Sequence, residues 1–136
     1  MTSVFLDTFF LLALVNSEDD SHQQSLSLHG AYRTGLVTTE YVLIETLDAL
    51  VSGDARQAGL DIVAAIREDR SIKVVAASTE LLETGIRLFA SRPDKNWGIT
   101  DCMSFVVMRE LGITEVLTAD HHFEQAGFRA LLRAAM

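Results

Sequence analysis

The sequence of 136 residues contains only one cysteine and one proline, and its 11 basic residues are outnumbered by 19 acidic ones. The single cysteine, Cys102, excludes an internal disulfide and a multi-cysteine zinc site, which agrees with a reducing compartment. The net charge of -8 disfavours sequence-blind adhesion to polyanions. Any nucleic-acid function must therefore depend on where particular charges lie.

Long apolar runs and leader features are also absent. The charge-free apolar stretch at residues 8–15 is far shorter than the roughly 18 to 20 residues that a membrane span requires. No Lys or Arg precedes this stretch and no plausible cleavage site follows it, so we expect no secretory signal. These features predict a cytoplasmic protein that does not engage a membrane.

Apolar residues are abundant, at 49% of the chain against 22% charged residues. This composition excludes a disordered or low-complexity chain. The length suits one domain, because domains most often contain roughly 100 to 150 residues. With no repeat and no linker in the sequence, we expect a single domain over residues 1–136.

Short apolar runs alternate with longer stretches in which apolar residues recur at helical spacing. The runs typical of strands are residues 4–6, 36–38, 72–75 and 116–118. The stretches typical of helices are residues 9–15, 18–32, 41–51, 54–70, 78–91 and 100–111, with a short polar helix before Phe128. This alternation predicts an α/β fold with three layers (α/β/α) and a mainly parallel central sheet of four or five short strands.

Several local features sharpen this prediction. Gly53 is expected to end the third helix, and Thr100 is expected to cap the most apolar one. Trp97 could stack on a base, although a lone Trp in such a loop more often packs against the adjacent helix. The apolar residues expected to face inward from the helix at 78–91 are Leu81, Leu82, Ile86 and Phe89.

Acidic residues lie at the places where a sheet of this kind binds ligands. Asp7 and Asp120 each follow a predicted strand, and ligands gather beyond the carboxyl ends of parallel strands. Asp101 lies in the first turn of the most apolar helix, where the helix dipole favours negative charge. Glu45 lies in the helix after the second strand. Taken singly, these residues could be helix caps, a turn residue and a surface acid, but together they favour a common site.

Convergence of these acids would have a chemical consequence. Two unit charges 4 Å apart repel by about 4 kcal/mol at an effective dielectric near 20, so such a cluster must take up protons or bind cations. Oxygen-only ligands, without nearby Cys or paired His, favour Mg²⁺ or Mn²⁺ over zinc. Enzymes that hydrolyse phosphodiester bonds commonly use a partly hydrated Mg²⁺ bound by carboxylates, so a nuclease is predicted.

Four segments, in this order, resemble the PIN domains, and especially the VapC-type ribonuclease toxins of bacterial toxin–antitoxin pairs. They are VFLDT at residues 4–8, VLIETL at 42–47, WGITDCMS at 97–104 and LTADHHF at 117–123, followed by GF at 127–128. The resemblance covers essentially the whole chain. It implies a PIN-like domain with Mg²⁺-dependent (or Mn²⁺-dependent) endoribonuclease activity that leaves a 5′ phosphate and a 3′ hydroxyl.

The resemblance also implies roles for particular residues. The four catalytic and metal-binding positions are Asp7, Glu45, Asp101 and Asp120. Asp7 and Asp101 would be the principal ligands, and the other two would complete the site directly or through water. Thr8 and Thr100 resemble the hydroxyl neighbours that support such acids. The implied partners are an RNA substrate and a small DNA-binding antitoxin, and we expect a homodimer.

Other polar groups near the expected site allow more than one interpretation. Arg92 and Lys95 are candidate RNA contacts, although a solvated loop explains them equally well. Of His121 and His122, at most one should approach a phosphate, because adjacent helical residues diverge by about 100°.

Three other functions stay open on sequence alone. They are a noncatalytic PIN-like protein-binding module, an RNA-processing nuclease without an antitoxin, and a phosphotransfer domain. The last, which includes phosphatases with a similar acidic edge, lacks the late Lys that would partner a phosphorylated Asp.

Overall fold

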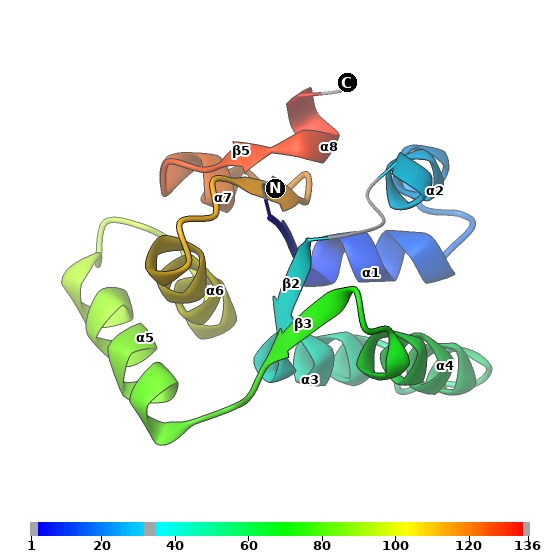
Figure 1. Ribbon diagram of the computed structural model, residues 1–136, viewed down its shortest axis with the longest axis horizontal. Coiled ribbons are helices and arrows are strands. Elements are labelled where there is room, and N and C mark those ends of the chain that lie inside the picture. The colour runs from blue at the N-terminus through cyan, green and yellow to red at the C-terminus, as the bar shows by residue number, and fades with distance from the viewer. Residues whose placement is uncertain (1–2, 32–34, 135–136) are drawn as a thin grey trace.

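The computed structural model describes the backbone of residues 3–31 and 35–134, with side chains through residue 26 and from 35 to 132 (Figure 1). Five strands form one parallel sheet in the order β3-β2-β1-β4-β5. The strands are β1 (Val4–Leu6), β2 (Leu36–Thr39), β3 (Ile72–Val75), β4 (Glu115–Leu117) and β5 (Arg129–Ala130). The predicted sheet is confirmed, and its fourth strand begins and ends one residue earlier than expected.

Helices cover the strands on both sides. They are α1 (Thr8–Val15), α2 (His22–Ala31), α3 (Glu40–Ala49), α4 (Ala55–Glu68), α5 (Thr79–Ser91), α6 (Ile99–Glu110), α7 (His121–Gln125) and α8 (Leu131–Ala134). Figure 1 shows α5 and α6 together on one side of the strands, with α1, α3 and α4 on the other, so the three-layer prediction is confirmed. None of the helices in the described ranges is long and apolar enough to cross a membrane.

Three predicted helix boundaries were wrong. α2 begins at His22 and not at residue 18, because the side chains of Asn16 and Asp19 accept backbone N–H bonds two residues ahead and hold turns there. Its predicted last residue, 32, lies outside the described ranges. α3 ends at Ala49, and Gly53, with φ of 56°, lies in the turn before α4.

The third wrong boundary concerns α6. Gly98 is its N-cap, so Thr100 lies inside the first turn instead of capping it.

The core includes buried residues of the strands, of α6 on one side and of α1 and α3 on the other. Every residue of α6 from Cys102 to Met108 is buried, but α1, whose eight residues include no charged side chain, is the more apolar helix, so the ranking of α6 as the most apolar was wrong. The Trp97 ring is also buried: it packs edge-on against Phe105 at 5.0 Å between centroids, and its indole N–H donates to Gln125 Oε1 at 3.0 Å. Trp97 is therefore a packing residue, and its ring is not exposed for stacking on a base.

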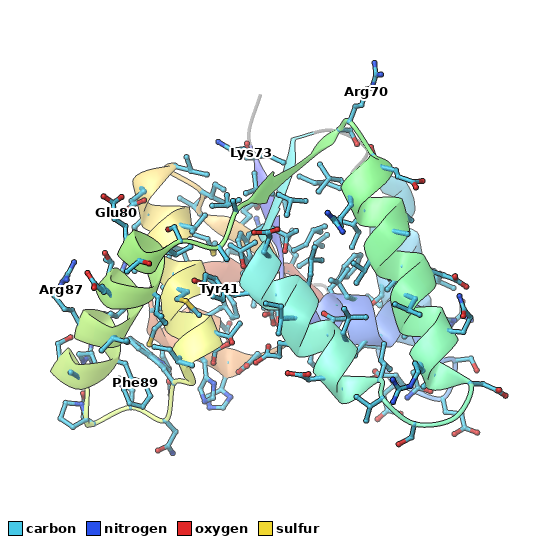
Figure 2. All side chains as sticks on the ribbon, turned by 90° about the horizontal axis from the view of Figure 1, so that it is seen from below. Tyr41, Arg70, Lys73, Glu80, Arg87 and Phe89 are labelled. Atoms are coloured by element: carbon cyan, nitrogen blue, oxygen red, sulfur yellow. The ribbon has the colours of Figure 1, made fainter. Side chains whose placement is uncertain are left out.

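The prediction for α5 was only partly right. Leu81 is buried, but Leu82, Ile86 and Phe89 are 38%, 48% and 52% exposed. α5 contacts α6 through a narrow seam that includes the buried Gly85, and the opposite face turns outward. Figure 2 shows Phe89 at the periphery of the molecule. We call Leu82, Ile86 and Phe89 the α5 apolar stripe.

The seam between α5 and α6 gives a stability prediction. A Cβ on Gly85 would lie 2.5 Å from Met103 Cγ, whereas one on Gly59 in α4 would meet only Leu50 and Leu47 side chains at 3.3 Å or more. We expect Gly85→Ala to lower the free energy of unfolding by about 1–3 kcal/mol through overpacking. Gly59→Ala should be near neutral, because helix propensity offsets a milder contact. Urea denaturation of both variants checks this, and equal effects would contradict it.

Candidate metal centre

The site lies where the order of strands in the sheet reverses. β1 is flanked by β2 on one side and β4 on the other, and ligands bind at such switch points. Leu6 of β1 pairs in register with Leu117 of β4, so the residues that follow these two strands emerge side by side. Thr118 Oγ1 accordingly donates a hydrogen bond to Asp7 Oδ2 at 2.8 Å. The predicted place of Asp7 is confirmed.

Asp7 is an acid buried to 4% exposure. Its carboxylate lies at the N-cap of α1, with Oδ2 3.4 Å from the Phe9 amide, so the helix-cap interpretation is also correct. Burial, followed by the carboxylates of Asp101 and Asp120, raises the pKa of Asp7 to about 7, against the lowering effect of the Thr118 hydrogen bond. The aspartates are thus close enough to resist one another's ionisation.

Asp101 and Asp120 bring two more carboxylates to this edge. Burial and then the Asp120 carboxylate raise the pKa of Asp101 to about 6, and Glu45 adds to the same effect. Asp101 Oδ2 lies 3.4 Å from the Gly98 amide at the start of α6. Asp120 is the N-cap of α7 and accepts a 2.9 Å bond from the His122 amide. Three aspartates from three distant segments therefore meet in one electrostatic cluster.

Glu45 reaches the cluster from α3. It is more exposed than the aspartates, and Thr8 Oγ1 donates to its Oε1 at 2.6 Å. This bond joins the first residue of α1 to α3 and confirms that the Thr8 hydroxyl lies against one of the four acids. Among the described residues, no hydrogen bond links the Thr100 side chain to any of the four acids, so that predicted contact is not seen.

Sequence reasoning missed one member of the site, Thr118, and did not settle which of His121 and His122 takes part in it. The signal for Thr118 was its place two residues before Asp120 at a strand end: its hydroxyl also accepts from the Asp120 amide at 3.1 Å. His122 Nδ1 lies 3.3 Å from Asp101 Oδ2 and 3.2 Å from Asp120 Oδ1. Nothing in a helical pattern indicates that contact, because Asp101 is distant in the sequence.

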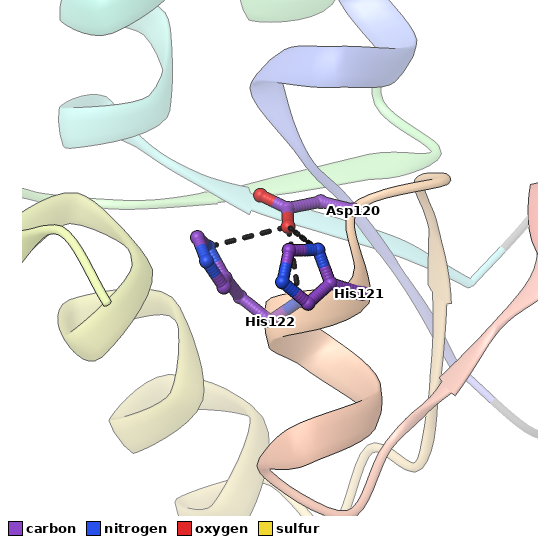
Figure 3. Close-up of side chains that lie close together, drawn as sticks. All are labelled: Asp120, His121 and His122. Atoms are coloured by element: carbon purple, nitrogen blue, oxygen red, sulfur yellow. Dashed lines mark hydrogen bonds and ion pairs between the residues drawn. The ribbon is translucent and has the colours of Figure 1, made fainter. Parts of the chain in front are cut away.

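The two histidines also lie closer together than the helical divergence indicated. Their ring centroids are 4.4 Å apart, and both rings turn toward Asp120 (Figure 3). One donor atom from each of Asp120, His121 and His122 lies within 4.8 Å of the other two. The premise that no paired histidines lie near the acids was therefore wrong.

The basic residues predicted to contact RNA lie on the loop before α6. Arg92 forms a two-pronged pair with Asp94, with both N–O distances 2.9 Å, and its guanidinium lies 5.1 Å from the Trp97 ring centroid. This pairing fixes the Arg92 head group beside the loop. An RNA contact by Arg92 or Lys95 stays a prediction.

The donor set suits a divalent cation. Three aspartates and one glutamate gather at one edge, and within the described ranges none of them forms an ion pair with Lys or Arg. Burial first, and then the neighbouring carboxylates, raise the pKa values of Asp7 and Asp101, and a bound cation would offset both effects. Carboxylates of this kind hold hard divalent ions.

Thr118 gives the second prediction, because it serves two acids at once. It is fully buried, donates to Asp7 and accepts from the Asp120 amide. We expect Thr118→Val to leave both groups without this partner, to cost about 1–3 kcal/mol of stability and to weaken metal binding about 10–100-fold. Calorimetric titration and thermal unfolding measure these effects.

Thr46→Val is the matched control for this variant. Thr46 is equally buried, but its hydroxyl only bonds back to the Val42 carbonyl within α3. Its replacement should leave metal affinity within about twofold of the unmodified chain. Equal losses of metal affinity in the two variants would contradict the role of Thr118.

The fold and this cluster define the class of protein, and comparison with known families agrees. The family model described as the PIN domain matches residues 4–129, so the chain belongs to the PIN-domain family, and the expected resemblance is confirmed. PIN domains are nucleases that generally depend on divalent metal ions.

Among curated relatives, the chain is similar to the 23S rRNA-specific endonuclease VapC20 of Mycobacterium tuberculosis. The two are 30% identical over 125 residues, which cover 92% of this chain and 95% of the relative. The crystal structure of VapC20, described as a sarcin–ricin loop cleaving toxin, superposes with a TM-score of 0.85 at 29% identity, covering 93% of this chain and 96% of that one.

More distant structures share the fold. The DNA-bound VapBC of Salmonella typhimurium has a TM-score of 0.64 at 17% identity and covers 96% of this chain and 97% of that one. VapBC2 of Rickettsia felis, bound to a promoter DNA fragment, has a TM-score of 0.64 at 16% identity and covers 95% of this chain and 97% of that one.

Proposed function

We propose that this chain is a divalent-metal-dependent endoribonuclease, the toxin of a type II toxin–antitoxin pair, whose substrate is 23S rRNA at the sarcin–ricin loop. The observation that carries the proposal is the buried Asp7 carboxylate, gathered with Asp101 and Asp120 without a Lys or Arg partner among the described residues. The similarity to VapC20 over 92% of the chain supports the substrate class.

In this proposal each acid has a defined task. Asp7 and Asp101 would hold Mg²⁺ or Mn²⁺, and Glu45 and Asp120 would complete the site and orient water. An ion held by these residues would lower the pKa of a coordinated water and would neutralise charge on the phosphate. Thr8 keeps the Glu45 carboxylate turned toward α1 through its 2.6 Å bond.

The fixed donors limit how far the acids can move. Thr118 holds Asp7 Oδ2 at 2.8 Å, and backbone amides at the starts of α1, α6 and α7 hold Asp7, Asp101 and Asp120. An arrangement fixed in advance loses less entropy when ion and substrate bind. Hydrolysis in this proposal leaves a 5′ phosphate and a 3′ hydroxyl.

The partner assignments extend the proposal. The VapBC similarities support a small DNA-binding antitoxin as a partner, and the α5 apolar stripe supports a homodimer because exposed apolar surface often marks an interface. Arg92 and Lys95 are proposed to contact RNA near the site. Sedimentation of Ile86→Lys tests the dimer: a monomer is expected for the variant, and an unchanged sedimentation coefficient would place any dimer contact elsewhere.

The activity itself is tested with an RNA stem-loop that carries the sarcin–ricin sequence. We expect the tag-free protein to cut this RNA at one position when Mg²⁺ or Mn²⁺ is present, and to leave a stem-loop with a scrambled loop sequence intact. EDTA should abolish the cleavage. VapC20 serves as the positive control. If VapC20 cuts this RNA and the present chain cuts neither it nor total cellular RNA, the nuclease proposal is wrong, and a noncatalytic binding module replaces it.

A further inference from the structure

His122 lies among the acids of the metal centre in a way that the four-carboxylate assignment does not use. Its Nδ1 is 3.3 Å from Asp101 Oδ2 and 3.2 Å from Asp120 Oδ1 (Figure 3 shows the Asp120 contact). These oxygens come from different elements, α6 and the cap of α7. The imidazole thus joins two of the acids proposed to bind the ion.

These distances are those of neighbouring ligands around one ion. With octahedral bonds of about 2.1 Å, adjacent ligand atoms lie about 3 Å apart. The Nδ1 atom meets that spacing to both carboxylate oxygens. Little movement would therefore be required for the nitrogen and the two oxygens to bind the same cation.

The His122 ring is less exposed than that of His121 and contacts two acids. The His122 amide donates to Asp120 Oδ1 at 2.9 Å, and its side chain is only 21% exposed. His121 is 59% exposed, and its Nδ1 lies 3.7 Å from Asp120 Oδ1. Of the two, His122 is the one held against both acids, which makes His121 its matched control.

We propose that Nδ1 of His122 is a ligand of the divalent ion and makes the centre favour Mn²⁺ and Co²⁺ over Mg²⁺. The inference rests on the proposed metal-dependent function and deepens it. Its physical reason is that imidazole suits later first-row ions, whereas carboxylate and water suit Mg²⁺. Affinity for a mixed nitrogen and oxygen site also rises from Mn²⁺ to Co²⁺.

The alternative role for His122 is a hydrogen bond from Nδ1–H that only holds the two carboxylates together. Ion selectivity separates these roles. If His122 is a ligand, it contributes more to the binding affinity for Co²⁺ and Mn²⁺ than to that for Mg²⁺. If it only positions the acids, its removal changes the affinity for all three ions by a similar factor. The readout is binding of the metal alone, which requires no RNA cleavage.

The experiment titrates the tag-free full chain with Mg²⁺, Mn²⁺ and Co²⁺ at one pH by calorimetry. We expect His122→Phe, which keeps a ring without nitrogen, to lose about tenfold or more in Mn²⁺ and Co²⁺ affinity. Its Mg²⁺ affinity should change by less than about threefold. His121→Phe should bind all three ions as the unmodified chain does, and thermal melts confirm that each variant is folded.

A second variant and an absorption spectrum distinguish the loss of a metal ligand from a folding defect. His122→Gln offers an amide oxygen in place of nitrogen and should bind Mg²⁺ normally but Co²⁺ weakly. The visible absorption of bound Co²⁺ should differ between this variant and the unmodified chain, because the ligand atom changes. Identical spectra would overturn the assignment of Nδ1.

The outcomes also separate this inference from the proposed function. Equal losses for Mg²⁺, Mn²⁺ and Co²⁺, or no loss for any, would overturn the ligand role of His122 and leave the nuclease proposal standing. If the unmodified chain binds none of the three ions, the metal centre itself is wrong and both proposals fail.

Discussion

Asp7→Asn should abolish RNA cleavage and at the same time stabilise the metal-free protein at pH 8. If Asp7 is a principal metal ligand, as proposed, its loss removes several kcal/mol of transition-state stabilisation, so we expect cleavage to fall by roughly 1000-fold or more. Asparagine has nearly the same shape as aspartate, and its carbonyl can still accept the Thr118 hydrogen bond. The fold should therefore survive the change.

The stability gain follows from the charge that the substitution removes. Asp7 is almost fully buried, and burial together with two neighbouring aspartates raises its pKa to about 7, so at pH 8 the folded protein holds an unfavourable charge. Removing it should raise the free energy of unfolding by about 1–3 kcal/mol. Urea denaturation in EDTA and a cleavage assay in Mg²⁺ measure the two effects.

Asp54→Asn is the matched control. Asp54 is exposed at the start of α4, and its side chain makes no capping hydrogen bond. The Asp54→Asn variant should cleave RNA at the normal rate and should be no more stable than the unmodified chain. An Asp7→Asn protein that cleaves RNA at the normal rate would refute the assigned site, and one less stable than the unmodified chain would contradict the charge argument.

The stability of the metal-free protein should fall as the pH rises from 5 to 8. The folded pKa values of Asp7 and Asp101, about 7 and about 6, both lie above the ordinary value of 3.8. A raised folded pKa gives stability that is fully present below pH 3.8 and is lost as the pH passes the folded pKa. The combined loss between pH 5 and pH 8 should be about 2–4 kcal/mol, or about 7–14 °C in Tm.

Mg²⁺ should reverse this loss at pH 8. An ion at 100 times its Kd adds about 2.7 kcal/mol if it binds only the folded state. The control is the pH profile of Asp7→Asn, which should be flatter because one of the two titrating acids is gone. A metal-free Tm that is constant from pH 5 to 8, or a Tm at pH 8 that does not respond to Mg²⁺, would contradict a crowded carboxylate site.

The sheet and the positions of the aspartates were predictable because both depend on local order in the sequence. Short apolar runs followed directly by Asp7 or closely by Asp120 place these acids at the carboxyl edge of any parallel sheet. The alternative of an ordinary helix cap was also right for Asp7, and Asp120, for which the alternative was a turn, is the N-cap of α7. An N-cap carboxylate and a ligand-site carboxylate can be the same group, because helices begin where strands end.

What sequence could not supply was contact between distant elements. The bond from Thr118 to Asp7 depends on which strands are neighbours, and the contact of His122 with Asp101 depends on how α7 meets α6. Periodicity likewise shows that α5 is amphipathic but not how much of its apolar face is covered. Its seam with α6 runs through Gly85 and Leu81, which leaves the α5 apolar stripe exposed.

The most direct measurement is an anomalous difference map from crystals soaked in Mn²⁺ and recorded with X-rays at which manganese scatters anomalously. We expect one strong peak about 2.2 Å from carboxylate oxygens of both Asp7 and Asp101, at the carboxyl ends of β1 and β4. A map with no peak among the four acids, or with manganese only at surface carboxylates elsewhere, would contradict it.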